Sequence, residues 1–272
     1  FRFRRYGCTG RYRMKIALVG YGKMGHMIET AALKCGHEIV CTVDLFAEDA
    51  GCITGDSGEM VRAIKKSGAE GIIEFSHPAS VMQNITALIP ARIPLVVGTT
   101  GWKDNLPAIT EQVALNKTAL LHAANFSVGV NLFYRIVAEA ARLVSEFDAY
   151  DAGLFEAHHN QKADSPSGTA LDIARRVMEN MPNKKRLVTN SADHKPEPDE
   201  LHLGSVRVGS VPGTHTVWFD SAADTIELTH TARNREGFAL GAVRALEWLA
   251  APDQEGKDRV GVFTMDDVFK EL

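Results

Sequence analysis

The stretch Ile16-Ala-Leu-Val-Gly-Tyr-Gly-Lys-Met-Gly25 decides the fold. Its four apolar residues predict a short buried strand, and the run that follows Gly25 has helical spacing. In the Gly-x-Gly-x-x-Gly pattern between them, the first glycine permits a tight turn, the second a close ligand approach and the third close packing. A second predicted strand, 38–43, ends at Asp44, an acid at the spacing typical of dinucleotide-binding units. We therefore expect a cofactor to contact Gly20, Tyr21, Gly22, Lys23, Met24, Gly25 and Asp44. The alternative is a glycine-rich turn in another kind of strand–helix unit.

Strand and helix patterns continue to alternate as far as residue 123. The strands are expected at 71–75, 94–97 and 118–123, and the helices at 60–67, at 106–116 and from Ser76 or Pro78 onward. This alternation predicts an α/β fold with a doubly wound parallel sheet, which binds ligands at the carboxyl ends of its strands. The loops at these ends are therefore expected to contact the cofactor through Phe75, Ser76, Gly98, Thr99, Thr100, Ala124, Asn125 and Phe126. A plain turn is the alternative for the Gly-Thr-Thr-Gly segment that begins at Gly98.

The period of the pattern changes in the second half of the chain. A long amphipathic helix is expected over 128–146, and a polar loop punctuated by prolines over 182–201. Three alternating runs then predict strands at 203–209, 214–219 and 225–232. These runs indicate a second α+β domain with an antiparallel or mixed sheet. Long and short helices are predicted at 237–249 and 268–272.

A polar stretch, Glu156-Ala-His-His-Asn-Gln-Lys-Ala-Asp-Ser-Pro-Ser-Gly-Thr169, joins a predicted strand at 150–156 to a predicted helix at 170–181. Its turn opens a helix whose first N–H groups attract carboxylate or phosphate. His158 can donate a proton and Lys162 can stabilise negative charge. The alternative to a functional site is a solvated polar loop followed by an ordinary helix N-terminus. A metal site formed by His158, His159 and Asp164 is not expected, because adjacent side chains of an extended segment point to opposite sides.

The composition narrows the class of protein. The chain has 272 residues and a net charge of −4, which gives no signal for nucleic-acid or membrane partners, and it has no apolar run long enough for a bilayer. Four cysteines without CxxC spacing predict free thiols in a reducing, cytoplasmic setting. Residues 1–13 carry five arginines and no acid, so we expect a non-native or disordered extension, with Met14 as the natural start.

The motifs together resemble those of the 4-hydroxy-tetrahydrodipicolinate reductase (dihydrodipicolinate reductase) family of lysine and diaminopimelate biosynthesis. The resemblance covers essentially all of Met14 to Leu272, and the Glu156–Thr169 element is its most specific part. Two departures are visible: the glycine loop is one residue shorter than in many members, and Ser165 stands where many have alanine. The matching segments are 20–25, 98–101, 124–131, 156–170 and 213–242.

The resemblance implies a Rossmann domain from 14–124 and 236–272, and a substrate-binding and oligomerisation domain from 125–235 with an open mixed sheet. It implies an NAD(P)H-dependent enzyme, and a homotetramer, that reduces 4-hydroxy-tetrahydrodipicolinate to tetrahydrodipicolinate. His158 would be the proton donor and Lys162 the charge stabiliser. The dicarboxylate substrate would bind at His159, Lys162, Ser167, Gly168 and Thr169.

Two other functions remain as alternatives, namely a different nicotinamide enzyme such as an amino-acid dehydrogenase, and a non-catalytic dinucleotide sensor. The first gives no reason for the His158–Thr169 pattern, and the second gives none for reactive groups at His158 and Lys162. Asp44 would repel a 2′-phosphate, and the acids Glu48 and Asp49 follow it without a nearby Arg or Lys other than Lys23. NADH is therefore the expected cofactor, ahead of NADPH.

Overall fold

The computed structural model describes residues 13–189 and 194–271. The prediction for the extension 1–13 therefore lies, apart from Arg13, outside the described residues. The chain divides into two compact units, one made of residues up to Val128 together with those from Glu236 onward, and the other of Gly129–Arg235. The sequence placed the first boundary a few residues earlier, at 124/125, and the second at 235/236.

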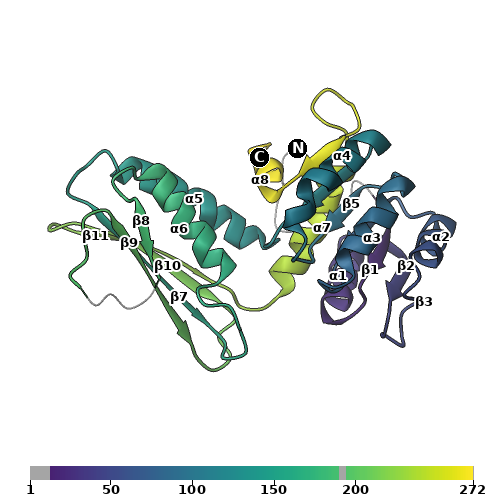
Figure 1. The fold of residues 1–272 in the computed structure, drawn as a ribbon, viewed down its shortest axis with the longest axis horizontal. Helices are drawn as coiled ribbons and strands as arrows, with labels where there is room; N and C mark the ends of the chain where they lie inside the picture. Colours follow the sequence, from purple (N-terminus) through teal and green to yellow (C-terminus); the bar gives the residue numbers. More distant parts are fainter. Residues whose placement is uncertain (1–12, 190–193, 272) are drawn as a thin grey trace. The chain divides into compact units, whose positions relative to one another are not determined.

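The first unit is built on a seven-stranded, wholly parallel sheet with the order β12-β6-β5-β4-β1-β2-β3 (Figure 1). Its strands are β1 (Lys15–Val19), β2 (Glu38–Asp44), β3 (Cys52–Ile53), β4 (Gly71–Glu74), β5 (Leu95–Val97), β6 (Ala119–His122) and β12 (Gly261–Phe263). Its helices are α1 (Lys23–Lys34), α2 (Ser57–Ser67), α3 (Val81–Leu88), α4 (Leu106–Asn116), α7 (Glu236–Ala250) and α8 (Met265–Lys270), with short 3₁₀ turns η1 (Ile89–Ala91) and η2 (Lys103–Asn105). The predicted doubly wound fold is confirmed.

Apolar residues on both faces of the strands explain this layering. Ile16 and Leu18 of β1 face a core shared with α1, α7 and α8, whereas Ala17 and Val19 face a core shared with α2, α3 and α4. Continuous apolar strands of this kind are stable only when helices cover both faces of the sheet. The side chains that could specify a ligand therefore lie in the loops at the strand ends.

Three local predictions for this unit need correction. The helix expected from Ser76 or Pro78 begins at Val81, because the carbonyl of His77 accepts hydrogen bonds from the N–H groups of Ser80 and Val81 in a preceding turn. The strands β3 and β12 were not predicted, because two or three residues are too few to show an alternating period. Cys41 and Cys52 are free, but Cys35 is disulfide-bonded, so the inference of a reducing compartment from four free thiols loses its support.

The second unit packs two helices on a five-stranded mixed sheet with the order β11-β10-β7-β9-β8 (Figure 1). β7 pairs with β10 in antiparallel fashion and with β9 in parallel fashion. The elements are α5 (Val128–Val144), β7 (Asp151–His158), α6 (Gly168–Asn180), β8 (Arg186–Val188), β9 (Glu200–Arg207), β10 (Thr214–Asp220) and β11 (Thr225–Thr231). The loop predicted over 182–201 contains β8 and the start of β9. Their polar sequence does not predict strands, and the parallel pairing of β8 with β9 stabilises them as strands.

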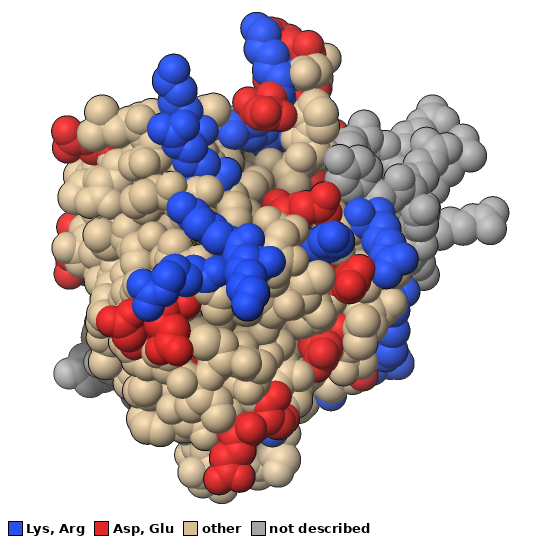
Figure 2. All heavy atoms as spheres, turned by 90° about the vertical axis from the view of Figure 1, so that its right-hand side faces the viewer, with Lys and Arg blue, Asp and Glu red and all other residues tan. Residues whose placement is uncertain are grey.

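The apolar character of the helices and the distribution of surface charge are two further properties of the chain. Across residues 13–189 and 194–271, none of the helices has both the length and the apolar character needed to cross a bilayer. On the face drawn in Figure 2, basic side chains have acidic side chains beside them, so this face mixes both signs of charge.

Candidate active site

The glycine loop at the end of β1 has the geometry that a dinucleotide requires. Gly20 has a φ of +90°, and a Cβ there would lie 2.2 Å from the carbonyl oxygen of Phe75. A Cβ on Gly25 would lie 2.5 Å from the carbonyl oxygen of Gly20, whereas one on Gly22 would point into open space. Gly22 is also the N-cap of α1 and supplies no capping side chain. The loop therefore leaves room and backbone N–H groups for a pyrophosphate at the helix N-terminus.

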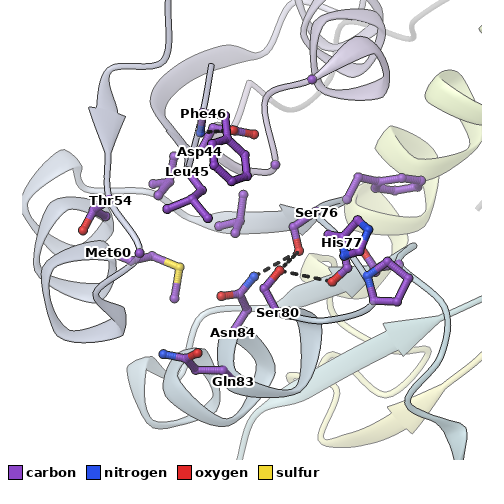
Figure 3. A pocket seen from close by; sticks show the side chains of 18 of the residues that line it. Asp44, Leu45, Phe46, Thr54, Met60, Ser76, His77, Ser80, Gln83 and Asn84 are labelled. Carbon is purple, nitrogen blue, oxygen red and sulfur yellow. Dashed lines mark hydrogen bonds between the residues drawn. The ribbon is translucent and has the colours of Figure 1, made fainter. Parts of the chain in front are cut away.

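A cavity of about 620 Å³ opens beside this loop, between the carboxyl ends of β1, β2, β4 and β5 (Figure 3). The predicted cofactor residues that line it are Gly20, Gly22, Lys23, Met24, Asp44, Phe75, Ser76, Gly98, Thr99 and Thr100. Five other predicted cofactor residues are not among the described residues that line the cavity, namely Tyr21, Gly25, Ala124, Asn125 and Phe126. Phe126 instead is buried with its ring 5.7 Å from that of Phe75, so it supports the wall of the cavity from behind.

Asp44 fixes one wall of this cavity. One carboxylate oxygen accepts the N–H of Tyr21 at 2.6 Å, and the other accepts those of Phe46 at 2.8 Å and Ala47 at 3.0 Å. Burial alone would raise the pKa of Asp44, but these backbone donors outweigh it and hold the pKa below its usual range. Asp44 therefore stays ionised and ties the glycine loop to the loop after β2.

The opposite wall is a polar network that the sequence did not reveal. Ser76 Oγ lies 3.2 Å from Ser80 Oγ and 3.1 Å from Asn84 Nδ2, and the three side chains meet at the cavity (Figure 3). The buried Glu74 accepts hydrogen bonds from Ser76 and Asn84, although burial raises its pKa overall. Ser80 and Asn84 were missed because the turn before α3, and not the sequence pattern, turns them toward the strand ends.

In the second unit, the fully buried carboxylate of Glu156 collects several donors. Oε1 accepts hydrogen bonds from the N–H of Ser167 at 2.8 Å, from Ser205 Oγ at 3.0 Å and from Arg207 Nη2 at 3.0 Å, and Oε2 accepts one from Ser167 Oγ. Burial alone would raise the pKa of Glu156, but His158, Ser167 and Arg207 hold it far below its usual range. Glu156 therefore stays ionised near neutral pH under the loop that carries His158.

Strand register brings these side chains together. Glu156 on β7 stands opposite Ser205 on β9 and opposite His215 on β10, and His158 stands opposite Arg207. Nδ1 of His158 lies 3.0 Å from Oε2 of Glu156, and the rings of His158 and His215 are 5.1 Å apart and nearly perpendicular. Glu156, Ser205, Arg207 and His215 form what we call the Glu156 cluster, and none of the four was assigned a role from the sequence.

The start of α6 holds a carboxylate of the chain itself. Lys162 Nζ lies 2.7 Å from Asp164 Oδ1. Burial alone would raise the pKa of Asp164, but Lys162 and the N–H of Gly168 lower it overall. The predicted anion site is thus electrostatically suited to a carboxylate and already carries one.

The other predicted substrate residues are placed differently. Both donors of Ser167 point inward to Glu156, and its Oγ also accepts the N–H of Ala170 at 3.1 Å, which makes it the cap of α6. Thr169 follows in the first turn of that helix. His159 is half-buried, and its carbonyl accepts the N–H of Lys162 at 3.1 Å. Lys162, Gly168 and Thr169 are therefore grouped at one end of α6, with His158 at the end of β7.

Comparison with known families decides the identity of this arrangement. The N-terminal model of dihydrodipicolinate reductase matches residues 14–126, and its C-terminal model matches 129–269. The chain belongs to the dihydrodipicolinate reductase family. This is a family of pyridine nucleotide-dependent reductases.

Individual relatives agree with this family. The 4-hydroxy-tetrahydrodipicolinate reductase of Christiangramia forsetii is 38% identical over 259 residues, which covers 95% of this chain and 99% of that protein. That of Archaeoglobus fulgidus is 36% identical over 263 residues, with 93% and 99% covered. Among solved structures, the dipicolinate-bound dihydrodipicolinate reductase of Paenisporosarcina sp. TG-14 shares the fold with a TM-score of 0.72 at 21% identity, with 93% of this chain and 98% of that chain covered.

The buried histidine of this dihydrodipicolinate reductase family member gives a pH-dependent prediction. Burial, together with the charge of His158, lowers the pKa of His215 from 6.5 to about 4. The unfolded chain then binds more protons than the folded one, so the contribution of His215 to stability is present above about pH 6.5 and is lost as the pH falls toward 4. The free energy of unfolding should fall by roughly 2 kcal/mol from this residue alone between about pH 7.5 and pH 5.

Urea denaturation at both pH values, in the parent chain and in His215→Asn, measures this contribution. The variant cannot take up the proton at this position, so its free energy of unfolding should change less over the same interval. Parallel pH dependence in the two proteins would show that His215 is protonated without cost.

Proposed function

We propose that this chain catalyses the NAD(P)H-dependent reduction of 4-hydroxy-tetrahydrodipicolinate to tetrahydrodipicolinate, as the names of its relatives indicate. The observation that carries the proposal is the placement of His158, Lys162 and the start of α6 within one short segment of the second unit. A dicarboxylate needs a cationic, donor-rich site, and this segment offers one. A bound nicotinamide would supply the hydride, and the 4-hydroxyl group leaves as water.

The residues of the chain then have separate tasks. Lys162, together with the N–H groups of Gly168 and Thr169, holds a substrate carboxylate and stabilises the charge that develops on the ring. Ser167 keeps the start of α6 in place through Glu156. His158 delivers the proton to carbon, and the Glu156 carboxylate beside its Nδ1 stabilises the imidazolium form.

A coupled assay tests this function directly. The purified chain is mixed with freshly formed product of dihydrodipicolinate synthase, and oxidation of NADH is followed by absorbance. We expect oxidation that depends on both proteins. Oxidation of NADH with a keto acid and ammonia, and none with the synthase product, would instead identify an amino-acid dehydrogenase.

We propose NADH as the preferred cofactor. Asp44 lines the cavity as an ionised carboxylate, and Lys23 is the single Lys or Arg among the described residues that line it. His26 is paired with Asp49, one of the acids that follow Asp44, at 2.7 Å. Its imidazole is therefore already engaged and does not offer a free positive charge to a 2′-phosphate. A 2′-phosphate beside Asp44 would meet like charge without a compensating fork of donors.

Exchanging these charges should change the cofactor preference. The double variant Asp44→Ser/Leu45→Arg should shift the ratio of kcat/KM for NADPH over NADH upward by roughly 1–3 kcal/mol, which is about five- to 150-fold. Leu45→Arg alone is the matched control, because it adds the guanidinium and keeps the repulsion and the three amide contacts of Asp44. A clear NADPH preference in the parent chain would contradict the proposal.

A homotetramer is part of the same proposal. Support comes from exposed apolar side chains on the strands of the second unit, namely Val206 on β9 and Ile226 on β11. Light scattering on the eluting protein measures the mass, and a monomer at micromolar concentration would contradict the assembly.

A further inference from the structure

The second unit holds three metal-ligating side chains that converge in its interior. Glu156, His158 and His215 each offer one ligand atom, these atoms lie within 4.8 Å of one another, and all three residues are buried. Oε2 is 3.0 Å from Nδ1 of His158 and 3.6 Å from Nε2 of His215. Ligands of a tetrahedral Zn²⁺ with bonds near 2.05 Å are roughly 3.3 Å apart, and the two distances from Oε2 each lie within about 0.3 Å of that value.

A second observation points to a ligand at the same place. Nδ1 of His158 makes no hydrogen bond although the residue is only 7% exposed, and its near neighbour is the carboxylate oxygen of Glu156. A buried imidazole nitrogen that has a carboxylate oxygen beside it but no hydrogen bond lacks the hydrogen bond it would have in water. A divalent cation between the three side chains would use its lone pair.

We propose that Glu156, His158 and His215 form a binding site for Zn²⁺. Two imidazoles and one carboxylate are a donor set found in zinc enzymes, and they leave a fourth position for water. Mg²⁺ and Ca²⁺ prefer oxygen ligands, so the two imidazoles select against them.

The surroundings of the site set its strength. Arg207 opposes a cation, but its Nη2 contacts Oε1 of Glu156 and leaves Oε2 to the metal. The Ser167 hydroxyl, which donates to Oε2, has to turn away when an ion enters. Lys162 is held by Asp164, which offsets part of its charge. His215 favours binding, because its low pKa keeps it neutral at physiological pH.

The consequence for activity rests on the proposed function, whereas binding itself does not. Zn²⁺ on Nδ1 would engage the imidazole that the proposed function assigns as the proton donor. Zn²⁺ should therefore inhibit the reductase reversibly, and chelation by EDTA should restore activity.

Titration of the full chain with Zn²⁺ alone, followed by calorimetry, tests the site without substrate or cofactor. We expect one Zn²⁺ per chain and no comparable binding of Mg²⁺. His215→Asn and Glu156→Gln should each weaken Zn²⁺ binding about tenfold or more, since even loss of an outer-shell partner has an effect of that size. Co²⁺ added to the unaltered chain should give the intense visible absorption of four- or five-coordination, which keeps the test valid if a variant does not fold.

A second carboxylate–imidazole group supplies the matched control. Glu200 has His194 at 3.1 Å and His202 at 3.5 Å, and both imidazoles are less buried than those of the proposed site. His202→Asn should therefore leave Zn²⁺ binding unchanged. Loss of binding in His202→Asn with retention in His215→Asn would overturn the proposal, as would the absence of stoichiometric Zn²⁺ binding in the parent chain. Zn²⁺ binding without reductase activity would contradict the proposed function alone.

Discussion

His158→Gln should lower kcat by about 10²-fold or more, the usual effect of removing a general acid. Glutamine can keep a polar contact with Glu156, but it has no proton to deliver at neutral pH. The Glu156 carboxylate beneath it is held by Ser167, Ser205 and Arg207, so the loop should keep its conformation. The affinity for NADH should be nearly unchanged, because the glycine loop and its cavity belong to the other compact unit.

Steady-state kinetics with the synthase product, together with binding of pyridine-2,6-dicarboxylate, separate catalysis from structure. Loss of turnover with retained affinity for this planar analogue of the product is the expected combination. Loss of both would indicate a collapsed loop, and the matched variant His202→Gln, on β9 outside the Glu156 cluster, should keep its turnover. Near-normal turnover of His158→Gln would exclude His158 as the proton donor.

Lys162→Met and Thr169→Val should each weaken binding of pyridine-2,6-dicarboxylate, by roughly 1.5–3 kcal/mol or about ten- to 150-fold. A charge-assisted contact with a carboxylate has this magnitude. For Lys162 the loss should lie at the lower end of the range. Its ammonium already pairs with Asp164 at 2.7 Å, so the incoming carboxylate replaces one anion with another.

Calorimetric titration of the analogue into each variant measures both losses. Lys185→Met is the matched control, because it removes the same charge elsewhere in the same unit. Lys185 is exposed and directly precedes β8. It should change the affinity little, since an isolated surface charge contributes little to binding at a distance under ordinary salt. Unchanged affinity in Lys162→Met and Thr169→Val would mean that the carboxylates bind elsewhere.

The order of helices and strands in the first unit could be predicted because its signals are local. A buried run of four residues, the glycine loop and the acid at Asp44 lie within about 30 residues, which is one strand–helix–strand unit. The position of the ligand at the carboxyl-end loops could be predicted from the parallel sheet alone. Ten of the residues predicted in these loops or in the glycine loop line the cavity. Phe126 is not among the residues that line the cavity, and its sequence position does not show that it packs behind Phe75.

The second unit was less predictable, since its contacts link segments that are far apart in the sequence. His158, Lys162 and the start of α6 could be found because they share one continuous motif with a helix start. Ser205, Arg207 and His215 carry no such local signal. Strand pairing alone places them beside Glu156, and a shift of one residue in register would turn them to the opposite face.

The sequence by itself determined the alternation of the Rossmann-type unit, the glycine loop and the identity of the loop that carries His158, because periodicity and turn chemistry act over a few residues. Only the tertiary structure decided that Ser167 faces inward, that Asp164 holds Lys162 and that two histidines and a carboxylate converge. A side chain's partner in a sheet depends on register between distant strands, and register is fixed by burial of a whole face.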